Sequence, residues 1–598
     1  MTFFLAAAWG LVILVGLVGW GDLLVRILRP ARPLPPGVAA AIGFAFSTIV
    51  GGLLGLIHAI RPPVVIAFVL LGVSAAIASH RGKSPRARHI SVLAILLWAV
   101  VAFRYAGAVK TVHFQPLDDI PAYLVYPIKM LQTGCFAPDP FSDRRLNGLG
   151  GQPWSQSLVL CLFDPSTVNL FDHGVMFLVL ILLIGQWMES IGLSVTMSRW
   201  ILLVFSLFYP VYLNCASFLS ITAEIFCLFV LLEDGPVDSI PRAILIALVT
   251  AALCDLKTTG IPFCGAILAV YFLSQCLRRR SPRPPIMAAV VAGMVFVLLL
   301  PWMIAMRQSS GTPLFPLLGN GYSQMPSVIG TTPPDVIWSL VFLAIFTAAV
   351  AVVVRRCTRN SSSARSWGAL ATLFMLVAAP VTVILGMNTG GVSWMRYSQP
   401  PLIAMLPFPL AALAISGRKA EFVAVACLFI LLPIGWLGRL GPLAGIGIEA
   451  ENIRASLPWR PPVSAEIVQR IQRLQASAPP GVPILARLDW PESIDFTRNI
   501  VYVTDHPGLA GPPPGVPQPT TAANLADYLL HCGIRYVAYS RFFQANRPGP
   551  ADLKASPYFL DQLAAERGLG FQNALDALSR RAIFNDGADV MIDLDQGN

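Results

Sequence analysis

Long apolar segments recur through the first 440 residues and limit what this chain can fold into. Of its 598 residues, 56% are hydrophobic and only 12% are charged, and the mean hydropathy is +0.68. Soluble domains carry about 25% charged residues, so the deficit indicates an integral membrane protein. Each apolar run is long enough to cross a bilayer as a helix.

We expect about 14 membrane-spanning helices. The first apolar run, residues 3–25, is too long and has the wrong flanks for a cleaved signal peptide, so it predicts a retained helix. The other predicted spans lie near residues 37–58, 63–79, 90–108, 170–190, 199–214, 217–232, 242–255, 259–277, 287–306, 335–355, 367–387, 399–416 and 420–438.

Basic residues form short clusters between the apolar runs, as in the cytoplasmic loops of membrane proteins. These clusters lie at residues 26–32, 80–88, 278–283 and 355–359. If they are cytoplasmic, alternation of the spans leaves the N-terminus and the chain after residue 440 on the outer face. The loops then predicted on the outer face are 109–169, 307–334 and 388–398. The net charge of +11 does not indicate nucleic acid, because no basic face with interleaved aromatic residues occurs.

Residues 441–598 differ from the membrane part, since charge rises and the apolar runs shorten. Residues 464–476 have helical periodicity with a serine cap, and residues 521–532 predict a second helix that ends at Gly533. Short strands are predicted at residues 482–487, 499–503 and 534–539. The fold class is therefore a mainly α, polytopic helical bundle (1–440) with a small extracytoplasmic α/β domain (441–598), in which we expect a parallel sheet.

The outer loop 109–169 carries the densest polar chemistry. Asp118 and Asp119 stand side by side just past an apolar span, where carboxylates are costly unless they have a task. A helix is predicted from Pro121 to Thr133, with Gly134 after its end, and we expect it to lie in the membrane interface. The alternative for the pair is structural: Asp118 caps this helix and Asp119 stabilises its first turn.

The rest of this loop contains the residue types of a sugar-binding cleft. Carboxylates and amides hydrogen-bond sugar hydroxyls, and aromatic faces stack on sugar rings. The candidates are Asp139, Asp143, Gln152 and Trp154. The alternatives are turn formation for the two aspartates and a membrane-interface anchor for the tryptophan.

Three motifs resemble integral membrane glycosyltransferases of the GT-C fold, in particular bacterial members of uncharacterised specificity. The spacing Asp119-x₃-Tyr123-x₅-Lys129-x₄-Gly134 is similar to their first extracytoplasmic loop. Lys257-Thr258-Thr259-Gly260 resembles a lysine/glycine stretch at a helix break. Pro301-Trp302 followed by Gly311-Thr312-Pro313-Leu314-Phe315-Pro316 resembles the loop written PW…GNPxFP in that family. The α/β domain after the last helix is similar too.

The resemblance implies transfer of a sugar from a polyprenyl phosphate or diphosphate at the outer face of a bacterial inner membrane. It also implies that an acidic residue of the first outer loop is essential, and Asp119 matches that position best. It places Tyr123 and Lys129 with the substrate. The chain has an adjacent Asp118–Asp119 pair rather than Asp-x-Asp, which leaves a divalent cation (Mg²⁺ or Mn²⁺) open.

Further cations fall on the predicted outer side, against the positive-inside bias. Lys257 is a candidate for the donor phosphate, with an ion pair to Asp255 or snorkelling as the alternatives. Arg307 and the pair Arg396-Tyr397 are further candidates, because arginine suits an anionic lipid phosphate. Their alternative is an ordinary headgroup contact.

The sequence thus predicts an inverting glycosyltransferase with Asp119, supported by Asp118, as general base or cation holder. Its expected partners are a lipid-linked donor, membrane lipids, and a glycan, lipid or protein acceptor. Two rivals stay open. A transporter or flippase of lipid-linked saccharides would place charges along a central cavity, and a polymerase or ligase of surface polysaccharide would share the substrates without the early Asp loop.

Overall fold

The fold is taken from a computed structural model. It describes residues 1–28, 34–80, 91–112, 114, 119–137, 139–142, 145, 148–208, 215, 217–279, 281–315, 328, 330–361, 364–392, 394–427, 442–541 and 554–596. Within these ranges the chain is mainly helical, with one five-stranded sheet near the C-terminus. The predicted fold class, a helical membrane bundle with a small α/β domain, is confirmed.

Nine helical segments of the described chain are long and apolar enough to cross a membrane. They are α1 (Thr2–Leu28), α2 (Pro36–Leu56), α3 (Pro62–His80), the Pro165–Ser190 segment that ends in α8 (Phe177–Ser190), α12 (Gly260–Arg279), α13 (Arg283–Ser310), α14 (Pro334–Thr358), α15 (Arg365–Asn388), and the Trp394–Ile415 segment made of α16 (Trp394–Met405) and α17 (Pro407–Ile415). The chain is an integral membrane protein.

Four further helices correspond to predicted spans but are shorter than the nine segments above. They are α4 (Val92–Ala108), α9 (Val195–Leu207), α10 (Phe218–Glu233) and α11 (Ile240–Leu256), with 13 to 17 residues each. The last predicted span, residues 420–438, lies mostly outside the described residues. The prediction of about 14 spans therefore located the apolar helices, although α9 and α11 begin before the predicted spans 199–214 and 242–255.

The C-terminal sheet is mixed rather than parallel, which corrects the prediction. Its strands are β1 (Pro483–Arg487), β2 (Ile500–Val503), β3 (Tyr536–Ser540), β4 (Ala582–Asn585) and β5 (Asp589–Asp593), in the order β2-β1-β3-β5-β4. The three predicted strands, β1, β2 and β3, are parallel, whereas β5 runs antiparallel to both of its neighbours. The unpredicted β4–β5 hairpin turns at Asp586-Gly587, a strong hairpin signal.

Three helices cover this sheet, and two of them were predicted. They are α20 (Ala465–Ala476), α21 (Ala522–His531) and α23 (Phe559–Leu578). The hydroxyl of Ser464 accepts a hydrogen bond from the Ile467 N–H, so the predicted cap is confirmed. Gly533 follows α21 with a φ of 76°, a conformation that favours glycine.

The predicted loop helix is present, and protein rather than lipid covers its apolar face. It consists of one π-helical turn, η1 (Ile120–Leu124), and α5 (Val125–Thr133), and it ends at Gly134 with a φ of 84°. Val125 and Ile128 pack against one face of the β1–β2–β3 sheet, and Phe141 packs against the other face. The outer loop therefore wraps around the edge strand β2, and its apolar side chains are removed from water by the two faces of the sheet.

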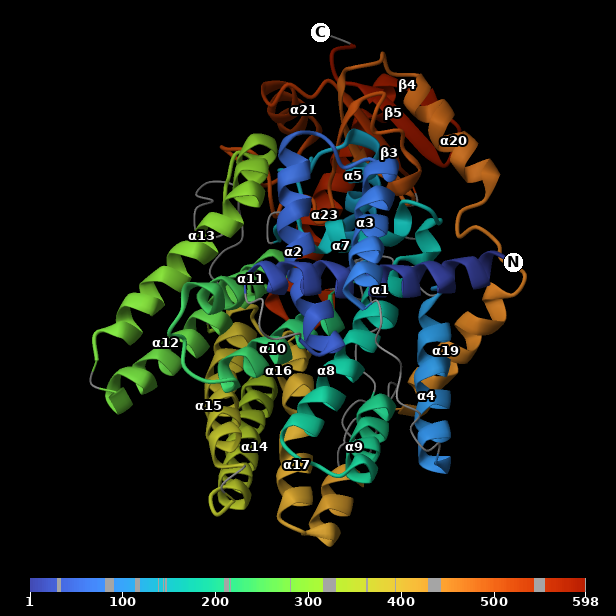
Figure 1. Cartoon of the computed structure of the whole chain (residues 1–598). Helices are drawn as coiled ribbons and strands as arrows, with labels where there is room; N and C mark the ends of the chain where they lie inside the picture. Colours follow the sequence, from blue (N-terminus) through green and yellow to red (C-terminus); the bar gives the residue numbers. More distant parts are fainter. Residues whose placement is uncertain are drawn as a thin grey trace.

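The α/β domain sits at one end of the helical bundle, and the α14–α15 turn lies at the opposite end (Figure 1). Tyr558, just before α23, contacts Gly391 in the loop between α15 and α16. The loop that carries α5 and the described residues 388–392 thus both contact the C-terminal domain.

Candidate functional site

Asp119 stands immediately before η1 and is almost completely buried, with 1% of its surface exposed. Its Oδ1 accepts a hydrogen bond of 2.9 Å from the backbone N–H of Cys215, in the segment that leads into α10. Its side chain makes no capping bond to the helix that it precedes. Asp119 therefore joins the outer loop to α10, while Asp118 lies outside the described residues.

Two glutamines from α7 (Gly151–Leu160) bind the carbonyl group of Cys215. The Nε2 atoms of Gln152 and Gln156 each donate a 2.8 Å hydrogen bond to the carbonyl oxygen of Cys215. Gln152, a predicted sugar ligand, is used here to hold the backbone, and Gln156 was not predicted at all. Three side chains of the outer loop thus fix the position of Cys215.

A fourth anchoring side chain, Asp172, was missed by the sequence prediction. It lies in a π-helical segment, η3 (Leu170–Met176), and accepts hydrogen bonds from the first residues of α10. Its partners are 46 to 48 residues away in the chain, so the sequence around Asp172 does not predict these hydrogen bonds.

Tyr123 and Arg396 connect the Asp119 turn to the membrane helices. The guanidinium of Arg396, in α16, donates a hydrogen bond to the Tyr123 hydroxyl. Its Cζ also lies 5.2 Å from the centroid of the Tyr123 ring, within the range of a cation–π interaction. Because Tyr123 is four residues after Asp119, the carboxylate and the arginine are joined by a single helical turn.

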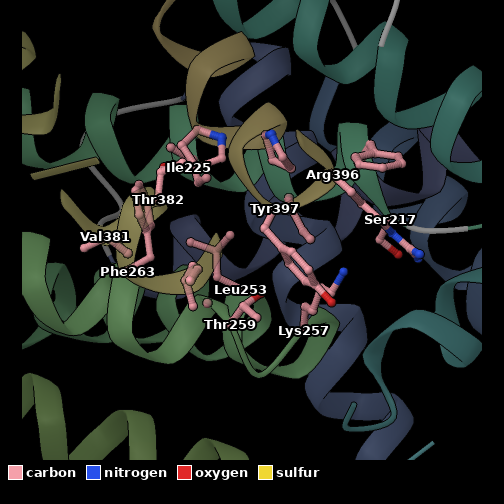
Figure 2. A pocket seen from close by; sticks show the side chains of 16 residues that line it. Ser217, Ile225, Leu253, Lys257, Thr259, Phe263, Val381, Thr382, Arg396 and Tyr397 are labelled. Atoms are coloured by element: carbon pink, nitrogen blue, oxygen red, sulfur yellow. The ribbon is translucent and has the colours of Figure 1, made fainter. Parts of the chain in front are cut away.

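Arg396 and Lys257 both line a pocket that opens between α10, α11, α12, α15 and α16. Figure 2 shows Lys257, Arg396 and Tyr397 at one end of the pocket, with Phe263, Val381 and Thr382 at the other. Most of its wall is apolar; the larger apolar residues include Phe218, Ile221, Ile225, Leu253, Phe263 and Leu385. The pocket is therefore amphipathic, with cations at one end and hydrocarbon side chains along its length.

The helix break predicted at Lys257-Thr258-Thr259-Gly260 places Lys257 in this pocket. Lys257 ends α11 in an extended conformation, and α12 starts at Gly260, whose N–H donates to the Lys257 carbonyl oxygen. A side chain at Gly260 would meet the Leu253 carbonyl oxygen at 2.6 Å, so the break requires glycine. The Lys257 ammonium lies over the Tyr397 ring, 4.4 Å from its centroid.

Lys129 and Asp139 belong to a different region of the loop. Their ion pair, with Nζ 3.3 Å from Oδ2, is buried beneath the α/β domain, and Lys129 also donates a 2.8 Å hydrogen bond to the Val501 carbonyl oxygen of β2. Neither residue lines the pocket. Burial raises the pKa of Asp139 to about 6, against the opposing effect of the Lys129 charge.

Trp154 has no exposed face for a sugar or for a membrane interface. Its side chain is 0% exposed and packs against Gly51 of α2 and edge-on to Phe68 of α3. Trp302, from the Pro301-Trp302 motif, is equally buried, and its Nε1 donates to the Thr48 carbonyl oxygen. Both tryptophans are core residues that hold the loop onto the membrane helices.

Arg307, a further predicted residue, does not line the pocket. Arg307 is exposed near the end of α13, where its Nη1 donates to the Gly311 carbonyl oxygen at 3.4 Å. Asp143 lies outside the described residues. Glu224 and Asp255 are completely buried within the bundle, and neither lines the pocket.

The described residues do not form a metal-ligand set. Among them, no three His, Cys, Asp or Glu side chains are grouped so that they could hold a metal ion. One oxygen of Asp119 is already bonded to a backbone N–H. We therefore assign no chemistry to a metal ion.

No family model matches the chain, and no curated protein matches it. Among solved structures, it is similar to ArnT from Cupriavidus metallidurans in the apo state, with 13% identity over 84% of this chain and 97% of that one, and a TM-score of 0.42. It is also similar to the archaeal oligosaccharyltransferase AglB from Archaeoglobus fulgidus, with 9% identity over 79% and 72% of the two chains and a TM-score of 0.41.

A third similar structure is the arabinofuranosyltransferase AftD from Mycobacteria, with 15% identity over 76% of this chain and a TM-score of 0.41; it is matched over only 36% of its own length. At these identities and TM-scores the similarities concern the general course of the chain. We transfer no residue role and no substrate from them.

Proposed function

We propose that this protein is an inverting membrane glycosyltransferase. It moves a sugar from a polyprenyl-(di)phosphate-linked donor to an acceptor on the outer face of the membrane. The proposal rests on the residues of this chain and on the GT-C resemblance of its motifs, with the donor sugar and the acceptor left open.

The amphipathic pocket is the observation that carries the proposal. A polyprenyl phosphate combines a long hydrocarbon tail with an anionic head, and the pocket offers apolar walls that end at Lys257 and Arg396. Arginine matches the geometry of phosphate oxygens, and lysine adds a compact charge. The tail would lie along α10, α12 and α15, and the phosphate would lie between the two cations.

The Asp119 carboxylate supports a proton-transfer role near this phosphate. It is anchored through Oδ1 to the Cys215 N–H and is joined to Arg396 through Tyr123. In the proposed reaction the acceptor hydroxyl attacks the anomeric carbon from the side opposite the phosphate, which inverts that centre. Asp119 takes the hydroxyl proton as a general base.

The bond between the anomeric carbon and the phosphate oxygen breaks in the same step, and its electron pair stays on the lipid phosphate. Negative charge therefore increases on the leaving group in the transition state. Lys257 and Arg396 stabilise that charge more strongly in the transition state than in the bound donor, which is the condition for catalysis.

The test is a transfer assay with purified protein in lipid vesicles and a panel of polyprenyl-phosphate and polyprenyl-diphosphate sugars. We expect release of the free lipid phosphate and formation of a glycosidic bond with inverted configuration from at least one donor. If a lipid-linked saccharide instead crosses the vesicle membrane with its sugar–phosphate bond intact, the transporter alternative is correct. Extension of a lipid-linked polysaccharide as the sole reaction would identify the polymerase or ligase alternative.

A further inference from the structure

The first turn of α10 takes its cap from a distant residue. Asp172 Oδ2 accepts hydrogen bonds from the N–H groups of Phe218 (3.0 Å) and Leu219 (3.1 Å), and Oδ1 accepts from the Ser220 N–H (2.8 Å) and hydroxyl (2.6 Å). Ser217, the residue at the usual capping position, makes no such bond. With 7% of its surface exposed, Asp172 is a buried carboxylate that accepts four hydrogen bonds.

The helix that Asp172 caps forms one wall of the proposed donor pocket. Ser217, Phe218, Ile221 and Ile225 of this segment all line it. Immediately before them, Cys215 is held by Asp119, Gln152 and Gln156. The start of this wall is therefore fixed at two points. Asp172 of η3 binds the first turn of α10, and three side chains of the outer loop bind Cys215.

The cap also has an electrostatic consequence. A helix N-terminus attracts anions through its unpaired N–H groups and the helix dipole. Ser217 lines the same pocket as Arg396 (Figure 2), so the α10 N-terminus lies near the end where the phosphate is expected. Because Asp172 occupies these N–H groups, they are not available to the phosphate, and we expect Asp172 to act on donor binding through the position of the α10 wall.

We propose that Asp172 is a positioning residue for the lipid-linked donor. It fixes the α10 wall and keeps the helix N-terminus closed to the phosphate. The inference rests on one part of the proposed function, that the lipid phosphate binds in this pocket. Binding of that lipid can be measured without turnover.

The experiment compares Asp172→Asn with Asp164→Asn in the full-length protein. An asparagine at 172 must turn its NH₂ group toward N–H or hydroxyl donors, so at least part of the cap is lost. Asp164 is the matched control: it caps the short helix Pro165–Thr167 by accepting hydrogen bonds from the Ser166 N–H and hydroxyl, and no residue of that helix lines the pocket. The probe is polyprenyl phosphate without a sugar, and the readouts are its Kd, the donor KM and kcat, and the thermal midpoint.

We expect Asp172→Asn to raise the Kd for polyprenyl phosphate and the donor KM about tenfold, the effect of hydrogen bonds to a charged group, with little change in kcat. Asp164→Asn should leave both constants unchanged even where its thermal midpoint falls equally. Ser220→Ala, which removes one of the four hydrogen bonds, is a milder variant and should raise the Kd about two- to threefold.

Equal Kd values for wild type, Asp172→Asn and Ser220→Ala would overturn the inference, as would a wild-type protein that does not bind polyprenyl phosphate. If the wild type binds the lipid and Asp172→Asn weakens binding, yet no donor supports sugar transfer, the proposed function fails and the positioning role stands. If Asp172→Asn does not fold, Ser220→Ala decides the outcome.

Discussion

The outer loop has two polar regions that contact different parts of the protein. One contacts the membrane helices, and the other contacts the α/β domain. Around Asp119 and Tyr123, polar side chains face the membrane helices and converge on Cys215 and Arg396. Around Lys129 and Asp139, they face the α/β domain and bind β2. Residue type and spacing therefore predict polar contacts in this loop. Whether a contact contributes to chemistry or to docking depends on which element it reaches, the membrane helices or the α/β domain.

The largest effect is expected at the first of these regions. Asp119→Asn keeps an oxygen for the Cys215 N–H but cannot take the acceptor proton, so sugar transfer should fall by a factor on the order of 10² to 10⁴ with lipid-phosphate binding retained. The measurement is the initial rate with a lipid-linked donor. Asp139→Asn is the control, and equal loss of transfer in both variants would remove the distinction between the two regions.

The second region should respond in stability rather than in transfer. Lys129→Met leaves the buried Asp139 carboxylate without its cation, which costs about 3–5 kcal/mol. Denaturant unfolding followed by limited proteolysis of the α/β domain would detect it. The exposed pair of Arg418 with Glu421 offers a control, since Arg418→Met should cost at most about 1 kcal/mol. Equal losses in the free energy of unfolding would mean that the Lys129–Asp139 pair stabilises the protein no more than a surface ion pair does.

The Asp139 carboxyl also predicts a pH dependence. Its pKa of about 6 in the folded protein lies above the ordinary value, so the folded state binds the proton more tightly than the unfolded state. The free energy of unfolding should therefore fall as the pH rises from about 4 to 6, by on the order of 3 kcal/mol. Asp139→Asn should flatten this slope, and an unchanged slope in that variant would assign the dependence to other groups.

The smallest predicted effect concerns how Lys257 is held. Tyr397→Phe keeps the ring under the ammonium, whereas Tyr397→Leu removes it at a cost of about 0.5–2 kcal/mol. We expect donor affinity to fall severalfold in the leucine variant and to stay near wild type in the phenylalanine variant. A large loss in the phenylalanine variant would show that the hydroxyl, and not the ring, is the important group.

The sequence predicted most of the elements because their signals are local. Apolar runs located the membrane helices, Ser464 and Gly134 marked helix ends, and the short strands β1, β2 and β3 were recognised from their flanking turns. The β4–β5 hairpin was missed although Asp586-Gly587 is a turn signal. The packing of α5 against the sheet was also missed. An amphipathic helix has the same sequence pattern whether a membrane or a protein domain covers its apolar face.

The candidate site was predicted in part for the same reason. Lys257, Arg396 and Tyr397 were recognised by type and predicted side of the membrane, and they line one pocket. Asp119 and Tyr123 were recognised by spacing; Tyr123 contacts Arg396, and the catalytic role of Asp119 stays a prediction. The roles of Gln156 and Asp172 depend on partners tens of residues away, which a single sequence does not pair. Trp154 was misread because full burial is a property of the packed fold and not of the motif.

The most direct test of the account is a structure of the protein with bound polyprenyl phosphate. We predict that the phosphate lies between the Lys257 ammonium and the Arg396 guanidinium, with the hydrocarbon tail along Ile221, Ile225 and Phe263. A phosphate bound at Lys129 and the α/β domain, or a lipid that leaves this pocket empty, would contradict the division of the outer loop into a chemical and a docking region.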